Sequence, residues 1–250
     1  PSELIKPVLI YILAIFFSNK KRYGEKSLET VLIWAMGVLA YAISVFAGKA
    51  LSSTLQITVL AFLMFCVSKI EHKYKIYIML MGIFASPIPI IAKNYRAGRI
   101  KQLLSGGSTQ TLAGINAIKS GSIFGRGFGL GIQKYFYLSE AHTDYMFASI
   151  SEEMGLIFIL VLLTAFFVLI SLIFYVGLNI KNSVEKYVIL GVGFVLTNQI
   201  VGHIGINLNI LPSTGITLPF ISYGGSALMS NLICVALLFK ALKSIEWVEK

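Results

Sequence analysis

The sequence predicts an all-α protein, a polytopic transmembrane helical bundle. Of its 250 residues, 56% are hydrophobic and 13% are charged, and the mean hydropathy is +0.81, whereas soluble domains carry a charge at about 25% of positions. A helix needs about 20 apolar residues to cross the hydrocarbon layer. About seven segments meet or approach that length: residues 7–18, 28–48, 54–68, 75–92, 154–178, 186–206 and 221–242. Together they predict one integral membrane domain over residues 1–250.

The first apolar segment begins almost at the start of the chain. Pro1 stands where an initiator Met would, and no signal-peptide pattern follows it, which indicates a fragment without its N-terminal part. Glu3 and Lys6 are three residues apart at the start of this segment. This spacing allows them to pair on one helix face, which lowers the cost of placing both charges in a membrane.

Basic residues indicate the orientation of the bundle. The net charge is +10, but Lys and Arg lie in the connections between apolar segments and form no continuous stripe, which argues against a nucleic-acid partner. They concentrate in alternate connections, such as residues 20–26, and in the C-terminal tail, so the positive-inside rule places these parts in the cytoplasm. Residues 92–152 and 207–221 are then extracytoplasmic loops of a multi-pass protein.

The loop of residues 92–152 is too long for an ordinary connection, and long ordered loops are usually functional. It contains Arg96, Arg99, Lys119 and Arg126 and more basic residues than any cytoplasmic connection. A long loop can escape the positive-inside rule, so this charge indicates an anionic partner rather than an opposite orientation. Within the loop, residues 109–119 have apolar positions at helical spacing, which suits a short helix on the membrane surface.

A glycine-rich segment follows at residues 121–131. It lacks the strand and helix that surround a dinucleotide-binding fingerprint. Two interpretations stay open: a tight turn in which the backbone approaches a ligand or the membrane, and phosphate contact through backbone N–H groups and Arg126. Glu152 and Glu153 open the fifth apolar segment, where they serve either as favourable charges at a helix N-terminus or as part of the site.

Asp144 is the first candidate for chemistry. It is the only aspartate in the chain, and a carboxylate at a membrane edge costs solvation free energy unless something compensates it. His142 is either structural or orients this carboxylate. Glu140, His142 and Asp144 match no compact zinc spacing, whereas a magnesium ion shared with a substrate phosphate would suit hard oxygen ligands. Ser222 and Tyr223 start the last segment, where small residues also permit close helix packing.

Short motifs follow one another along the chain in the order of a known family. They are PSELIK at residues 1–6, YRAGRI at 95–100, AIKSG at 117–121, YLSEAHTDY at 137–145, EEMG at 152–155, LPSTGITLP at 211–219 and SYGGS at 222–226. Together they resemble the SEDS family of polytopic cell-wall glycosyltransferases, which includes FtsW and RodA. Ala141 and Thr217 resemble the division branch more than the elongation branch. Residues 48–54 depart from the family, since GKALSST replaces a motif that contains an aspartate, and Ser139 replaces a proline.

The resemblance implies ten spans, of which the first three would be missing here. It also implies polymerisation of lipid II, the undecaprenyl-pyrophosphate disaccharide-pentapeptide, during bacterial cell division or elongation, on the outer face of the cytoplasmic membrane. Asp144 would be the general base. Arg96, Arg99, Lys119 and Arg126 would neutralise the pyrophosphate, with or without Mg²⁺ or Mn²⁺ and with no organic cofactor. The other predicted substrate-binding residues are Glu3, Lys6, Glu140, His142, Ser222 and Tyr223.

The resemblance further implies a class B penicillin-binding protein, a transpeptidase, as a partner within the lipid membrane. A lipid II flippase or transporter is the alternative function, because intramembrane charges such as Glu3 and Lys6 could belong to a substrate path. Against it, no inverted repeat is evident and the distinctive residues lie on one side of the membrane. A noncatalytic scaffold would not explain a base and many cations in one loop.

Overall fold

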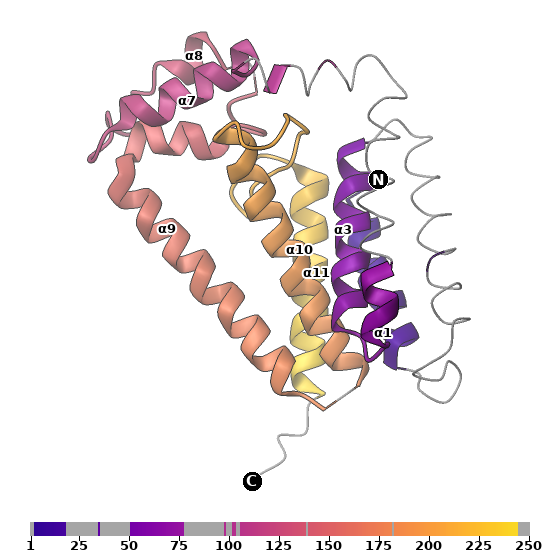
Figure 1. The fold of residues 1–250 in the computed structure, drawn as a ribbon. Coiled ribbons are helices and arrows are strands. Elements are labelled where there is room, and N and C mark those ends of the chain that lie inside the picture. Colours follow the sequence, from indigo (N-terminus) through magenta and orange to yellow (C-terminus); the bar gives the residue numbers. More distant parts are fainter. Residues whose placement is uncertain are drawn as a thin grey trace. The chain divides into compact units, whose positions relative to one another are not determined.

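The computed structural model describes residues 3–18, 35, 51–77, 98, 102–103, 106–138, 140–181 and 183–244, and over these residues the architecture is helical (Figure 1). The helices are α1 (Ile5–Ser18), α3 (Leu51–Val67), α7 (Thr109–Gly121), α8 (Gln133–Phe136), α9 (Met146–Asn179), α10 (Val184–Asn207) and α11 (Gly225–Lys243). The prediction of an all-α fold is confirmed.

Five of the predicted spans coincide with helices. Three of these helices, α9, α10 and α11, are long and apolar enough to cross a membrane. The apolar helices α1 and α3 are shorter, at 14 and 17 residues. The spans predicted at residues 28–48 and 75–92 lie mostly outside the described residues. The protein is therefore a polytopic helical membrane protein, and those two spans stay predictions.

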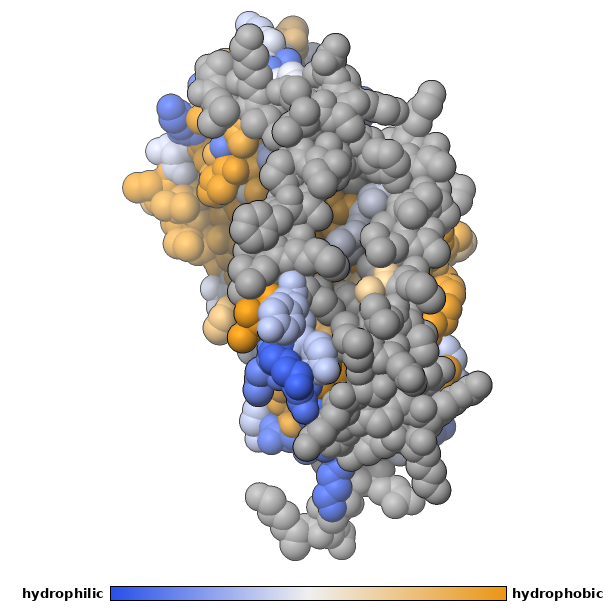
Figure 2. Space-filling view, turned by 45° about the vertical axis from the view of Figure 1, so that its right-hand side comes forward, coloured by the Kyte–Doolittle hydropathy of each residue, from blue (hydrophilic) through white to orange (hydrophobic). Residues whose placement is uncertain are grey.

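Hydrophobic side chains cover much of the described surface, as expected of helices that contact lipid. Leu160, Val161 and Phe167 of α9 are all exposed, and Figure 2 shows hydrophobic surface, in orange, on the described residues of one face. In the most apolar 18-residue segment of α9, only 17% is buried inside the protein, whereas 72% of the corresponding segment of α10 is buried. Because each helix satisfies its own backbone hydrogen bonds, apolar side chains can face hydrocarbon without cost.

The described chain packs as two compact units. Unit 1 comprises Pro1–Phe84, Ile170–Asn198 and Gly225–Lys250, and unit 2 comprises Ala85–Leu169 and Gln199–Gly224. Helices α9 and α10 each contribute one part to each unit. The prediction of a single integral membrane domain with two extracytoplasmic loops concerns placement in a membrane, and it stays a prediction.

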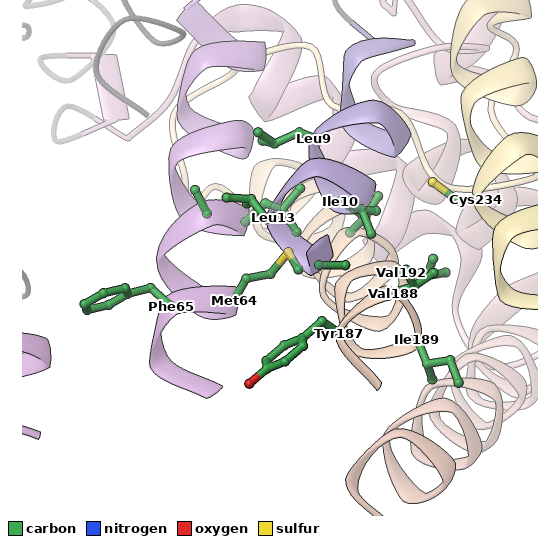
Figure 3. Packing of buried hydrophobic residues seen from close by; sticks show 14 of the residues in the cluster. Leu9, Ile10, Leu13, Met64, Phe65, Tyr187, Val188, Ile189, Val192 and Cys234 are labelled. Carbon is green, nitrogen blue, oxygen red and sulfur yellow. The ribbon is translucent and has the colours of Figure 1, made fainter. Parts of the chain in front are cut away.

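Unit 1 has a hydrophobic core between α1, α3, α10 and α11 (Figure 3). Ile10 of α1, Phe65 of α3 and Tyr187 of α10 are almost completely buried in it. Gly191 permits the close approach of α1 to α10, because a Cβ atom at this position would lie 2.7 Å from Ile10 Cγ2. The Cys234 thiol is buried in this core and is not in a disulfide.

Unit 2 is built on α7 and the first part of α9. The helix predicted at residues 109–119 is confirmed as α7, and the Thr111 N–H group donates to its N-cap, Ser108. Its buried face consists of small residues such as Gly114 and Gly121. A Cβ atom on Gly121 would lie 1.9 Å from the Ser151 carbonyl oxygen, so only glycine allows α7 to lie this close to α9. Contact of α7 with a membrane surface stays a prediction.

Candidate functional site

Helix α9 is broken at Gly155, whose φ of 74° and ψ of −177° are not helical. The break separates a short first piece, residues 146–154, from the long apolar piece that follows. Asp144 lies just before this first piece, and Glu152 and Glu153 lie at its end. The prediction that Glu152 and Glu153 open the span is therefore wrong. They lie at a helix C-terminus, where the helix dipole disfavours negative charge, and they need other partners.

The backbone of Asp144 is held from two directions. Its N–H group donates to the Glu140 carbonyl at 3.1 Å, and its carbonyl accepts from the side-chain amide of Asn207 at 3.0 Å. The carboxylate is half-buried and lies against Gly215, where a Cβ atom would be 3.4 Å from Oδ2. A larger residue at this position would cover part of the carboxylate, so Gly215 keeps that side accessible.

The N-terminus of α9 is capped by side chains of α10. The Phe147 N–H group donates to His203 Nε2 at 3.2 Å, and the Ala148 N–H group donates to Asn207 Oδ1 at 3.1 Å. The first N–H groups of a helix have no acceptor within it, so these bonds satisfy them. Because Nε2 of His203 accepts, Nδ1 carries the proton and donates to the Ile216 carbonyl at 2.7 Å. His203 and Asn207 are completely buried.

Ser222 and Tyr223 connect the last loop to the Asp144 loop. The Ser222 hydroxyl donates to the Thr143 carbonyl at 2.8 Å, and the Tyr223 N–H group donates to the His142 carbonyl at 2.9 Å. Helix α11 begins only at Gly225, so the predicted start of the last span at residue 221 is too early. These contacts place Ser222 and Tyr223 next to the residues that precede Asp144, whereas their role and that of His142 in substrate binding stay predictions. The side chains of Tyr223 and His142 are exposed.

Glu140 shapes the turn that leads to Asp144. Its carbonyl accepts the N–H groups of Thr143, Asp144 and Tyr145, and its carboxylate accepts the Thr143 hydroxyl at 3.0 Å. The ring of Tyr145, the residue after Asp144, is buried, and its hydroxyl lies 3.1 Å from the hydroxyl of Thr111 in α7. The turn is thereby fixed to α7 on one side and to α10 on the other.

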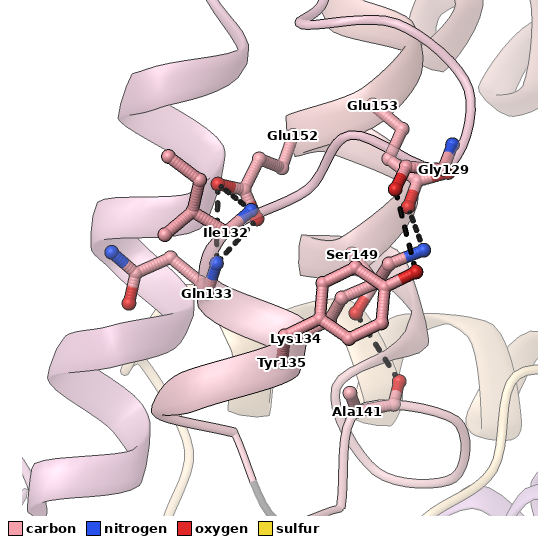
Figure 4. A network of polar contacts seen from close by, with 9 residues as sticks. All are labelled: Gly129, Ile132, Gln133, Lys134, Tyr135, Ala141, Ser149, Glu152 and Glu153. Carbon is pink, nitrogen blue, oxygen red and sulfur yellow. Dashed lines mark hydrogen bonds and ion pairs between the residues drawn. The ribbon is translucent and has the colours of Figure 1, made fainter.

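The glycine-rich segment is bound by the protein's own carboxylates (Figure 4). Glu152 accepts the N–H groups of Ile132 at 3.0 Å and Gln133 at 3.1 Å. Glu153 accepts the Gly129 N–H group at 2.9 Å and forms an ion pair with Lys134. The pair with Glu153 raises the pKa of Lys134. For these N–H groups the phosphate interpretation is wrong, because carboxylates already occupy them.

The same segment satisfies the backbone groups that the break in α9 exposes. The carbonyls of Glu152 and Glu153 accept the N–H groups of Arg126 at 2.9 Å and Gly127 at 3.0 Å. On the other side of the break, the Leu156 N–H group donates to the Ser122 carbonyl at 3.0 Å. Residues 121–131 thus form a tight turn whose backbone approaches α9, since buried backbone groups must be paired. Their approach to a ligand or the membrane stays a prediction.

The predicted cations are not all found beside Asp144. Lys119 is exposed at the end of α7, and Arg126 Nε lies 3.8 Å from Glu152 Oε1 with a side chain 39% exposed. Glu152 is eight residues after Asp144, or about 12 Å along a helix. Arg96 and Arg99 lie outside the described residues.

Glu3 and Lys6 form the predicted pair, with 2.6 Å between Glu3 Oε2 and Lys6 Nζ. The Glu3 carbonyl also accepts the Ser230 hydroxyl of α11 at 2.7 Å. Both residues belong to unit 1, whereas Asp144 belongs to unit 2. In the described part of the chain, no group of three or more His, Cys, Asp or Glu side chains is arranged to hold a metal ion.

His203 and Asn207 were not among the predicted site residues, although the sequence contains a signal for them. Gln199, His203 and Asn207 follow at intervals of four residues along an otherwise apolar segment, and all three are buried. Polar side chains inside a span usually face the bundle interior and mark functional positions. This spacing places them on one face of α10, which could have indicated an interaction with another element.

Comparison with known proteins identifies the family of this chain. The sequence profile of the family described as "Cell cycle protein", named for FtsW, RodA and SpoVE, matches residues 1–246. The chain belongs to this family. The predicted SEDS membership is therefore confirmed.

Several members of the family are similar to this chain. It is 32% identical to a probable peptidoglycan glycosyltransferase FtsW of Synechocystis sp. over 250 residues, which cover 97% of this chain and 63% of the relative. It is 31% identical to the stage V sporulation protein E of Bacillus subtilis, with 95% of this chain and 67% of the relative covered. The chain thus spans about two thirds of the length of such relatives.

Two solved structures share the fold. One, from work on the structural coordination of polymerization and crosslinking by a peptidoglycan synthase complex, aligns with a TM-score of 0.77 over 99% of this chain and 70% of that chain. The other, a mutant of the rod shape determining protein RodA from Thermus thermophilus, aligns with a TM-score of 0.65 over 95% of this chain and 64% of that chain. Both are 22% identical in sequence.

Proposed function

We propose that this protein is a peptidoglycan glycosyltransferase that polymerises lipid II. One observation carries the proposal: the chain's only aspartate is half-buried beside Gly215, with its carbonyl held by Asn207 of α10 and the preceding Thr143 carbonyl held by Ser222 of the last loop. Family membership and relatives named as probable peptidoglycan glycosyltransferases support the same activity. The FtsW names of several relatives also favour the cell-division branch.

Asp144 acts in this proposal as the general base. Its carboxylate takes the proton from the 4-hydroxyl of the acceptor GlcNAc, and that oxygen forms a bond to the anomeric carbon of the donor MurNAc. The bond from this carbon to the pyrophosphate oxygen breaks, and the polyprenyl pyrophosphate leaves with the electron pair. Attack occurs on the face opposite the leaving group, so the configuration is inverted. Asn207 and Glu140 hold the Asp144 backbone during this step.

The leaving group needs charge neutralisation more than protonation. Lys119 and Arg126 are exposed basic residues of unit 2, and Arg96 and Arg99 belong to the same predicted loop. Cations near a departing pyrophosphate stabilise the charge that develops on it. A divalent cation bound to the pyrophosphate would supply the same neutralisation.

Polymerisation of labelled lipid II by the purified full-length protein in vesicles tests the proposal. We expect glycan strands from the wild-type protein and none from Asp144→Asn. Movement of lipid II across the bilayer without polymerisation would instead favour the flippase alternative. Absence of both polymerisation and lipid II movement would favour a noncatalytic scaffold.

Alanine substitutions on the two predicted sides of the membrane test whether the basic residues act on the pyrophosphate. Arg96→Ala and Arg99→Ala should weaken the use of donor more than the use of acceptor, since the donor's pyrophosphate departs. Lys20→Ala and Lys21→Ala, on the predicted cytoplasmic side, should have smaller effects. Equal effects from both sides would show that these residues only stabilise the fold.

We also propose that the protein lies in the bacterial cytoplasmic membrane with Asp144 on the outer face and acts beside a class B penicillin-binding protein. A similar fold occurs in a peptidoglycan synthase complex. Coupling raises the effective concentration of the nascent strand at the transpeptidase. Labelling of the His142→Cys variant by an impermeant maleimide in intact cells tests which face of the membrane carries Asp144. A higher polymerisation rate on addition of the cognate transpeptidase tests the partnership.

A further inference from the structure

The glycine-rich segment and α8 expose a continuous stretch of hydrophobic side chains. Phe124 is 82% exposed, Phe128 is 85% exposed and Phe136 is 75% exposed. Residues 123–137, here called the aromatic loop, expose the following large hydrophobic side chains: Ile123, Phe124, Phe128, Leu130, Ile132, Tyr135, Phe136 and Tyr137. A contiguous hydrophobic surface of this kind usually marks contact with a protein or a membrane.

This exposure is built into the loop, because its backbone is fixed. Glu152 and Glu153 bind the N–H groups of Ile132, Gln133 and Gly129. A Cβ atom on Gly125 would lie 2.1 Å from the Glu153 carbonyl oxygen, and the φ of Gly125 is +81°. Buried carboxylates and a glycine in backbone contact thus hold the loop in one conformation, from which its aromatic side chains point away from the unit 2 core.

The loop is attached at the point where α9 becomes apolar. The N–H groups of Leu156 and Ile157 donate to the carbonyls of Ser122 and Ile123. Leu156 and Ile157 are themselves exposed, and so is Leu160 one turn later. The aromatic loop is therefore attached beside exposed apolar residues at the start of the long apolar piece of α9. Because that piece is long and apolar enough to cross a membrane, this attachment favours the bilayer as the environment of the loop.

The charges of the loop indicate which force holds it there. Lys134 pairs with Glu153, and Arg126 lies beside Glu152. These acids offset most of the positive charge, which leaves little net attraction for an anionic surface. Tyr135 and Tyr137 are exposed beside Phe136, and phenolic rings favour the interface between headgroups and acyl chains. Burial of apolar side chains to a depth of about 5–10 Å is the usual mode of such interfacial contacts.

We propose that the aromatic loop is an interfacial membrane anchor. Phe124, Phe128 and Phe136 enter the boundary between headgroups and acyl chains of the leaflet in which the long apolar piece of α9 begins. Apolar burial drives this contact, so it occurs on zwitterionic as well as anionic lipid. The anchor sets the depth of the break at Gly155 and of the short piece of α9 that precedes it. The inference depends on the membrane-spanning fold and not on the proposed enzymatic activity.

Tryptophan fluorescence of the full-length protein tests the anchor. The two tryptophans of this chain, Trp34 and Trp247, and any outside it are first replaced by Phe. Phe124→Trp, Phe128→Trp and Phe136→Trp are then made singly, because a larger aromatic at an exposed position keeps the fold. Each protein is reconstituted in phosphatidylcholine vesicles with brominated lipid. Val161→Trp, at an exposed position of α9, is the lipid-facing control, and Lys181→Trp, at an exposed position of the connection between α9 and α10, is the polar control.

We expect the three loop tryptophans to emit at shorter wavelength than Lys181→Trp, to be quenched by brominated lipid, and to resist aqueous iodide present on both sides of the bilayer. Adding phosphatidylglycerol should change this little. Iodide quenching equal to that of Lys181→Trp would overturn the anchor. Shielding from both quenchers would also overturn it, because the side chains would then be buried in protein. So would shielding that develops only after a transpeptidase is added, which would show a protein-docking surface instead.

Discussion

The two ends of the short first piece of α9, residues 146–154, are stabilised in opposite ways. At its start, neutral side chains from other elements hold the backbone near Asp144: the imidazole of His203, the amide of Asn207 and the hydroxyl of Ser222. At its end, Glu152 and Glu153 hold the backbone of another segment. A carboxylate is thus structural at one end, and at the other end it is the proposed general base.

The helix dipole explains part of this difference. Negative charge is favourable near a helix N-terminus and unfavourable near a C-terminus. Glu152 and Glu153 lie at the unfavourable end, and backbone N–H groups and Lys134 compensate them. Asp144 precedes the favourable end, where its carboxylate faces Gly215. Substitutions at the two ends should therefore separate loss of activity from loss of stability.

The largest effect is expected at Asp144. Asp144→Asn keeps the shape of the side chain but removes the base, so polymerisation should fall by about 10²–10⁴-fold. The temperature of half-unfolding in detergent should change little, because Asn207 and Glu140 still hold the backbone. Glu185→Gln, which removes a carboxylate from the first turn of α10, is the control and should retain activity. Near-normal turnover by Asp144→Asn would refute the assignment.

Glu152→Gln should show the opposite pattern. The buried carboxylate accepts two N–H groups and the Ser120 hydroxyl, and an amide would direct its own N–H groups toward these donors. We expect a loss of about 3 kcal/mol in the free energy of unfolding. Turnover per folded molecule should fall much less than for Asp144→Asn.

Glu71→Gln is the matched control for Glu152→Gln, since Glu71 pairs with an exposed lysine, Lys73. Such surface pairs contribute about 0–1 kcal/mol. Thermal unfolding and polymerisation are measured for both variants. A fully stable but inactive Glu152→Gln protein would place this residue in the chemistry and contradict the comparison.

Alanine substitutions at two glycines with the same φ measure how tightly the aromatic loop packs against α9. Gly125 and Gly129 both have a φ of +81°, but a Cβ atom on Gly125 would lie 2.1 Å from the Glu153 carbonyl oxygen, whereas nothing lies within 4 Å of one on Gly129. Both alanine variants incur the cost of a positive φ, about 1–2 kcal/mol. Gly125→Ala should be destabilised by about 1–3 kcal/mol more. Equal unfolding temperatures would show that the loop is not held tightly against α9.

The smallest effect is expected at Asn207. Asn207→Ala leaves the Ala148 N–H group and the Asp144 carbonyl without this partner, at a cost of about 1–2 kcal/mol. Displacement of Asp144 should also lower kcat, by about tenfold, with little change in KM. Asn198→Ala on the same helix removes one longer bond, to the Gln56 carbonyl at 3.4 Å, and should retain kcat. If both variants behave alike, Asn207 serves the fold alone.

The sequence by itself determined the helical membrane fold and singled out Asp144 as the candidate acid. Apolar segments of about 20 residues that cross a bilayer are helices, because only a helix satisfies its backbone hydrogen bonds within one segment in lipid. A lone aspartate in such a chain is costly, which points to Asp144. The tight turn at residues 121–131 and the helix at residues 109–119 follow from local chemistry in the same way.

The tertiary structure alone decided what holds these parts together. His203 and Asn207 reach α9 across 56 and 59 residues of sequence, and local patterns do not identify a partner at that distance. The helix N-terminal position predicted for Glu152 and Glu153 is wrong for a similar reason. Their sequence position before an apolar run indicated a helix start, whereas the break at Gly155 made it a helix end. Which group satisfies a buried N–H or carbonyl depends on which segments meet, and only the folded chain determines that.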